Sequence, residues 1–445
     1  MRNPKSSALW IFLIGLFIRT QVHVIGYMGL SELFVFLVAP IICIQDWPIL
    51  KRSGFGTLFA FLFAVMIGCC LSSVYNGTHI QLFLRGFAAC YSVFAFAVVF
   101  ARLLRGNIGD VKWFFLGAAI SGIISIYIMQ GTALTRSGAD INLRGEAAVE
   151  EIKNGALFWV GRIGPLIQLP IQMFYLKCPL LYSIIAPLFV GGMALVSSRG
   201  SGRSVFLTVV VSVLLIAFGR KRIDSIRRMM RMLPLYACVL MVSLVPIKMA
   251  YSYAASTGML GEHAERKYND QTKRGTDLIS MLISGRTDFF IGLYACCQQP
   301  IMGYGPWPQD VYGYRAYFYS KYGTDDELKN VHEYSDLWAL KTIPAHSHIV
   351  GFWLEYGLIG LLFWFYVLYH IFHFLRKNMD VIPHLYGYIA LALPGYVWGI
   401  FFSPFGSRAS TSMFMVVFLT AESIRRGRMR LSDSEMREIW EANKR

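Results

Sequence analysis

Long apolar runs separated by short polar segments dominate the hydropathy pattern of this 445-residue chain. A helix needs roughly 17–25 mostly apolar residues to cross a bilayer. About twelve runs approach that length, near 8–25, 28–45, 55–75, 80–101, 111–130, 155–176, 179–197, 203–219, 232–253, 348–374, 382–402 and 408–422. The pattern therefore predicts an all-α integral membrane protein with about 12 transmembrane helices.

One polar stretch is long enough to fold outside the membrane. It lies between the ninth and tenth predicted spans and is rich in Tyr, Gly and charged residues. The resulting division is helices one to nine in 1–253, a large loop in 254–347, helices ten to twelve in 348–424, and a basic tail in 425–445.

Clusters of Lys and Arg orient the predicted spans. With the span count above, all the short loops that carry such clusters fall on one side, including "GRKRIDSIRRMMR" at 219–231 and "RRGRMR" at 425–430. Short cytoplasmic loops are enriched in Lys and Arg, whereas long loops translocate largely regardless of charge. We therefore expect both termini on the cytoplasmic side and the large loop on the opposite, outer face.

Composition agrees with a membrane protein. Hydrophobic residues make up 56% of the chain and charged residues only 15%, against about 25% in soluble domains. The excess of 42 basic over 26 acidic residues gives a net charge of +16, which the cytoplasmic loops explain without a nucleic-acid partner.

The first apolar run lacks a clear cleavage site and is interpreted as a retained span. The eight cysteines contain no C-x-x-C and predict neither a disulfide framework nor a zinc site.

Three separate segments on the predicted outer face carry side chains suited to one reaction. Arginine binds two phosphate oxygens at once, and histidine can take a proton from a hydroxyl near neutral pH. Together they suit displacement of a phosphate leaving group by an alcohol. The segments are "SSRGSGRS" at 197–204 with Arg199 and Arg203, "SGRTDFF" at 284–290 with Arg286, and "PAHSHIV" at 344–350 with His346 and His348.

Simpler interpretations of these residues remain open at this point. An arginine at a span end commonly reaches a lipid headgroup, and a loop histidine is usually solvated or caps a helix. His346 and His348 are two apart, so on a helix they would point to nearly opposite faces, a poor arrangement for a metal pair. Asp325 and Asp326 could bind a divalent ion, but a solvated acidic turn fits them better, and no metal is predicted.

A turn in the large loop offers aromatic rings. "GYGPWPQ" at 303–309 places Trp307 before the many tyrosines of 311–322. These rings could stack on sugars, or they could belong to a packed loop with an interfacial aromatic belt.

With these motifs the sequence resembles the O-antigen ligase and polymerase superfamily, bacterial membrane glycosyltransferases of the GT-C type. "AHSHIVGFWLEYGLIGLLFWF" at 345–365 is similar to that family's histidine motif, with an acid two residues before a glycine. "SSRGSGRSVFLTVVV", "SGRTDFF" and "PIMGYGP" are similar to its span-opening arginine, loop arginine and Gly-x-Gly turn. The motifs cover roughly 195–375, and the N-terminal half agrees only in hydropathy.

The resemblance implies a reaction and its partners. Such proteins transfer a glycan from an undecaprenyl-pyrophosphate carrier to an acceptor hydroxyl, with inversion and without a metal or other cofactor. Polymerases use a growing lipid-linked glycan as acceptor, and ligases use lipid A–core. We favour a polymerase of O-antigen or exopolysaccharide repeat units, with the ligase as alternative. A twelve-span secondary transporter is the alternative from another class, although we see no repeated halves.

The resemblance also assigns roles to residues. His346 falls on the family histidine and is the expected base or acceptor-orienting group, with His348 as second choice. Arg286 falls on the loop arginine, and either Arg199 or Arg203 on the span-opening arginine. These arginines would hold the pyrophosphate and stabilise its developing charge.

Overall fold

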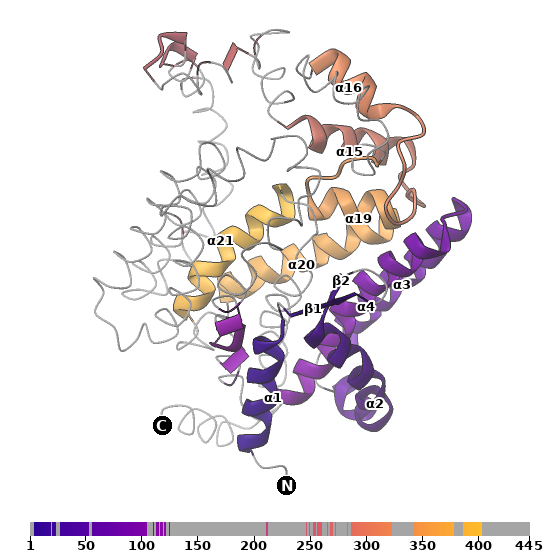
Figure 1. Cartoon of the computed structure of the whole chain (residues 1–445), viewed down its shortest axis with the longest axis vertical. Helices are drawn as coiled ribbons and strands as arrows, with labels where there is room; N and C mark the ends of the chain where they lie inside the picture. The colour runs from indigo at the N-terminus through magenta and orange to yellow at the C-terminus, as the bar shows by residue number, and fades with distance from the viewer. Residues whose placement is uncertain are drawn as a thin grey trace.

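The computed structural model describes residues 4–18, 20–23, 27–52, 56–104, 286–322, 342–377 and 386–402, with scattered residues of 110–124 and 211–283. This part of the chain is mostly helical (Figure 1). Arg199, Arg203, Asp325 and Asp326 lie outside the described residues.

The N-terminal part begins with a helix and a short hairpin. Helix α1 ends at Leu16, well before the end of the predicted run 8–25, because that run contains the polar segment "RTQVH" at 19–23. Strands β1 and β2 pair antiparallel there, a small departure from the predicted all-α fold. The elements are α1 (Pro4–Leu16), β1 (Gln21–His23), β2 (Tyr27–Gly29), α2 (Leu30–Arg52), α3 (Gly56–Tyr75) and α4 (Ile80–Leu103).

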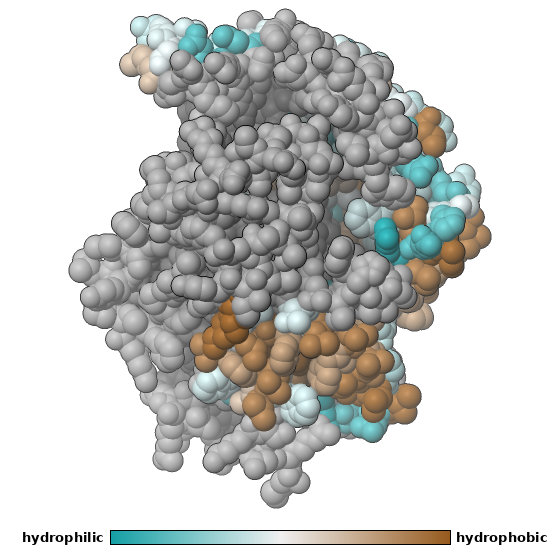
Figure 2. All heavy atoms as spheres, viewed as in Figure 1, coloured by the Kyte–Doolittle hydropathy of each residue, from teal (hydrophilic) through white to brown (hydrophobic). Residues whose placement is uncertain are grey.

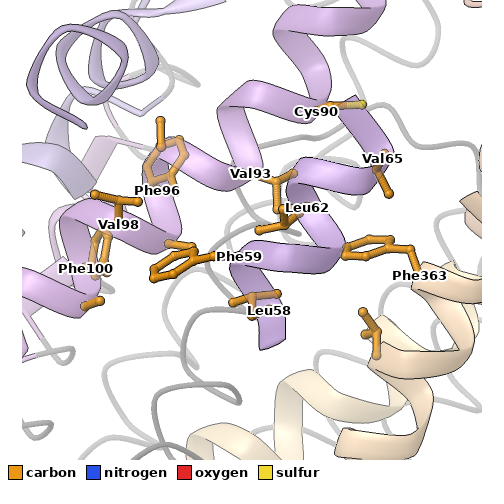
Figure 3. Packing of buried hydrophobic residues seen from close by; sticks show 14 of the residues in the cluster. Leu58, Phe59, Leu62, Val65, Cys90, Val93, Phe96, Val98, Phe100 and Phe363 are labelled. Carbon is orange, nitrogen blue, oxygen red and sulfur yellow. The ribbon is translucent and has the colours of Figure 1, made fainter. Parts of the chain in front are cut away.

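The C-terminal part contributes helices to two packed groups. Helices α19, α20 and α21 join the N-terminal helices in one apolar core, whereas α15 and α16 pack with α19 in a second one. In the first core Leu62 of α3 and Val93 of α4 lie side by side, and Phe363 of α20 points toward α3 (Figure 3). These helices are α15 (Thr287–Gln298), α16 (Tyr314–Tyr322), α19 (His348–Tyr356), α20 (Leu358–Lys377) and α21 (Tyr386–Phe402).

Apolar surface on the described helices fits a bilayer environment. Within the described residues, Thr57–Tyr75 and Ile80–Leu103 are long and apolar enough to cross a membrane, so the count of twelve stays a prediction. Helix α2 exposes Leu37, Ile41 and Ile44. Figure 2 shows large apolar patches in the lower half of the view, where α1 and α2 lie. In a soluble monomer such patches would be unusual.

The turn between α3 and α4 contacts the loop that follows α15. The side-chain amide of Asn76 donates to the carbonyl oxygen of Gly303 at 2.9 Å. Gln299 Nε2 donates to Asn76 Oδ1 at 3.2 Å and to the same Gly303 oxygen at 2.7 Å. The predicted topology places the turn at 76–79 and the large loop on the same side of the membrane, in agreement with this contact.

A break at Gly357 divides the predicted span 348–374 into α19 and α20. Gly357 has φ +68°, and a Cβ atom there would collide with the carbonyl of Ile301. Beyond the break α20 packs against α19, since Phe352 stacks on Phe363 with ring centroids 5.8 Å apart. The chain thus turns enough at Gly357 to bring the middle of α19 beside the first turns of α20.

Candidate functional site

Arg286 occupies the N-cap position of α15 and lies against the end of α21. Its backbone precedes the first helical residue, and the side chain makes no capping hydrogen bond. Instead the guanidinium Cζ lies 5.0 Å from the ring centroid of Phe402 and 5.6 Å from that of Trp398. Cation–π contact with aromatic faces is typical of arginine and leaves the edge of the fork available for hydrogen bonds. The residue is exposed, so an anion can reach it.

Ser347 fixes the histidine segment on the same end of α21. Its Oγ accepts from the backbone N–H of Val350 at 3.3 Å and so caps α19. The same hydroxyl donates to the carbonyl oxygen of Ile400 at 2.9 Å. Arg286 and the segment around Ser347 therefore both contact residues 398–402, although they are about 60 residues apart in sequence.

His346 makes a close contact with a carboxylate of α15. Its Nε2 lies 3.0 Å from Asp288 Oδ2, and the imidazole side chain is 52% exposed. The other carboxylate oxygen, Oδ1, accepts a hydrogen bond from the Tyr319 hydroxyl at 2.7 Å. Asp288 is only two residues from Arg286, so the predicted loop arginine and the predicted histidine belong to one cluster.

The electrostatic surroundings keep Asp288 ionised. Burial raises the pKa of this carboxyl, but several interactions lower it more. They are the hydrogen bond and charge of His346, the positive charge of Arg315, and the hydrogen bond from Tyr319. The pKa of Asp288 therefore lies below its ordinary value, and its position in the first turn of α15 adds the favourable helix dipole.

His348 points away from this cluster into the core. It is the first residue of α19, is 5% exposed, and packs against Trp364 with ring centroids 5.2 Å apart. The structure thus brings Arg286 and His346 together and places His348 elsewhere.

The turn at 303–309 is packed against the end of α19. Tyr304 N donates to Leu354 O at 2.7 Å, and Gly305 N donates to Glu355 O at 3.1 Å. Gly305 has φ +81°, which suits glycine. The packed-loop interpretation holds for this backbone, while the ring of Trp307 stays 41% exposed and open to solvent.

Sequence reasoning did not single out Asp288 or Tyr319. Asp288 lies inside the quoted motif "SGRTDFF", so the available signal was an acid in the first turn of a helix that follows the motif arginine. Tyr319 is one of many tyrosines in 311–322, and nothing in its spacing distinguishes it. Among the described residues, no three His, Cys, Asp or Glu side chains gather as a metal site would require.

Comparison with known proteins identifies one family. The model of the O-antigen ligase family matches residues 186–365, a segment that contains Arg199, Arg203, Arg286, His346 and His348. No curated protein and no solved structure matches the chain.

Proposed function

We propose that this chain, whose residues 186–365 match the O-antigen ligase family, transfers a glycan from undecaprenyl pyrophosphate to an acceptor hydroxyl. In the form we favour, it polymerises oligosaccharide repeat units of an O-antigen or exopolysaccharide. The reaction takes place on the periplasmic face of the inner membrane.

One observation carries the proposal. An exposed arginine, Arg286, and an exposed histidine, His346, are held together at the end of α21, although the sequence separates them by 60 positions. A phosphate-binding fork beside a proton acceptor is the pair that this substitution reaction requires. A scaffold protein or a transporter would not need this pair at the surface of its loop.

The proposed step is a direct displacement of pyrophosphate at the anomeric carbon of the donor glycan. The acceptor hydroxyl oxygen attacks the anomeric carbon of the donor glycan, and His346 takes the hydroxyl proton. The bond between that carbon and the pyrophosphate oxygen breaks, and its electron pair leaves with the pyrophosphate. Arg286, together with Arg199 or Arg203, stabilises the charge that develops there, and attack opposite the leaving group inverts the anomeric centre.

Transfer to lipid A–core is the second candidate function. The matching family carries the description of O-antigen ligase. Both reactions use the same donor and the same bond cleavage, so Arg286 and His346 serve either one. Only the acceptor differs, and the acceptor decides the product.

The experiment is glycan output from a deletion strain of the source organism complemented with wild type, His346→Ala, Arg286→Ala or Arg286→Lys. His79→Ala is the matched control, because His79 is an exposed histidine at the α3–α4 turn, away from the cluster. Lipopolysaccharide and secreted polysaccharide are resolved on one gel, and protein levels are checked by blotting.

We expect both alanine variants to lose output by on the order of 10²-fold or more, by analogy with losing one preorganised oxyanion donor. Arg286→Lys keeps the positive charge but not the planar fork of the guanidinium, so this variant should retain only part of the wild-type glycan output. Single repeat units accumulating on the carrier indicate a polymerase, whereas long chains that never reach lipid A–core indicate a ligase. Wild-type output from His346→Ala at normal protein level would contradict the proposal.

A further inference from the structure

We propose that Asp288 and Tyr319 are positioning residues that hold His346 in one tautomer, with its Nδ1 as the atom that takes the acceptor proton. This inference deepens the proposed function and rests on it. It assigns the proton-accepting atom and two supporting side chains from elements far apart in sequence.

The hydrogen-bond pattern determines the tautomer. An ionised carboxylate is an acceptor only. Asp288 Oδ1 is approached by the Tyr319 hydroxyl at 2.7 Å, and Oδ2 is approached by His346 Nε2 at 3.0 Å. Nε2 must therefore carry the hydrogen, and in the neutral imidazole the lone pair is on Nδ1.

His346, Asp288 and Tyr319 come from three segments that are anchored separately. Asp288 is in the first turn of α15, and Tyr319 lies buried on α16. One turn earlier on α16, the buried Arg315 donates from its guanidinium to the carbonyl oxygen of Thr342 at 3.0 Å. Thr342 begins the segment that leads to His346, so α16 supports both the carboxylate and the backbone of the histidine.

The charged and titratable groups around His346 come from two helices and include one carboxylate. From α15 come Asp288 and, at its start, Arg286, and from α16 come Tyr319 and Arg315. His348 on α19 faces the core, and residues 398–402 of α21 carry no titratable side chain. Asp288 is thus the one anionic side chain in direct contact with the ring among the described residues, and it stabilises the charge created by proton transfer.

The test uses the full-length protein reconstituted in lipid with purified lipid-linked repeat units, and it measures kcat and KM across pH. Asp288→Asn keeps the size of the side chain but removes the charge and allows the amide to donate to the ring. We expect kcat to fall on the order of 10²-fold, within the range of general-base catalysis, with KM for the donor nearly unchanged. We also expect the rise of kcat with pH to shift to lower pH, because a neutral amide no longer stabilises the imidazolium.

Further variants separate positioning from folding. Asp288→Glu should recover part of kcat, and Tyr319→Phe should lower it about fivefold, the equivalent of about one hydrogen bond. Asp310→Asn is the matched control, because Asp310 caps α16 through the backbone N–H groups of Tyr314 and Arg315. It should lower thermal stability and leave the pH profile of kcat unmoved.

The outcomes distinguish this inference from the proposed function. If Asp288→Asn retains wild-type kcat and pH profile while His346→Ala is inactive, the positioning role is wrong and the proposed function stands. The positioning role would also be wrong if Asp288→Asn lost activity while its pH profile stayed unmoved, as the pH profile of Asp310→Asn should. Activity in His346→Ala would overturn both.

Discussion

Ser347 separates the two histidines of the motif and decides which one reaches solvent. Its hydroxyl caps α19 and bonds the carbonyl of Ile400, so the chain turns from extended backbone into helix at this residue. His346, before the turn, is left in the exposed cluster, and His348, after it, enters the core.

Replacing Ser347 by Ala should therefore disturb both the helix and the site. Loss of an N-cap typically costs about 1 kcal/mol of stability, and the second hydrogen bond adds a similar amount. We expect Ser347→Ala to lower the midpoint of thermal unfolding in detergent. Ser320→Ala, at an exposed serine late in α16, should change stability by less than about 0.5 kcal/mol. Equal midpoints for the two variants would show that Ser347 does not anchor the segment.

The sequence pointed to Arg286 and His346 among five candidates, and their role stays a prediction; it did not point to the side chains that contact them. Spacing predicted that His346 and His348 point apart, yet only the contact of His348 with Trp364 shows which one is buried. Asp288 could not be distinguished from an ordinary acid in the first turn of a helix, a common and favourable position. Its importance comes from contacts with residues 31 and 58 positions away, which no local pattern encodes.

At the scale of elements, the break between α19 and α20 depends on a glycine packed against a distant loop. The N–H of Leu358 donates to the carbonyl oxygen of Ile301 at 3.0 Å, and the same carbonyl occupies the space of a Cβ at Gly357. The hydropathy of 348–374 could not predict this, since glycine is frequent in transmembrane helices and the apolar run is continuous. The break requires the loop after α15, whose packing only the structure provides.

Gly357→Ala should be strongly destabilising. The substitution combines a backbone conformation used almost only by glycine (φ 68°, ψ −153°), which costs roughly 1–3 kcal/mol for another residue, with a collision against backbone. We expect a marked loss of folded protein in detergent, measured by fluorescence-detected size-exclusion chromatography after heating. Gly395→Ala in α21 is the matched control, because a Cβ there meets no atom within 4 Å. Equal losses of folded protein in Gly357→Ala and Gly395→Ala would show that the conformation at Gly357 is not what the break between α19 and α20 depends on.

At the scale of the whole molecule, the membrane topology stays a prediction, and one described contact joins two segments that it places on the same side. The α3–α4 turn and the loop after α15 lie on one predicted side and are hydrogen-bonded to each other through Asn76. Hydropathy predicted α3 and α4 closely, because each is a long apolar run ended by polar residues, whereas α2 continues to Arg52, seven residues beyond the predicted run 28–45. It missed the hairpin at 21–29, where a few polar residues end α1 early, because a window of about 19 residues averages over so short an interruption.

A thiol-labelling experiment tests the orientation. Cys297 is exposed on α15, within the predicted periplasmic loop, whereas the neighbouring Cys296 is buried. A membrane-impermeant maleimide should label Cys297 in intact spheroplasts, as identified by peptide mass spectrometry, and the label should disappear in Cys297→Ala. Labelling that requires lysis of the inner membrane would place the loop in the cytoplasm and reverse the topology.

The most direct test of the central claim is bond cleavage by the purified protein. Wild type, His346→Ala and Arg286→Ala are reconstituted in liposomes with lipid-linked repeat units, and release of undecaprenyl pyrophosphate is measured together with the glycan product. We predict release coupled to transfer by wild type and a loss on the order of 10²-fold or more in each variant, at equal folded protein. Equal release by all three proteins would contradict the claim that Arg286 and His346 form one site for glycan transfer.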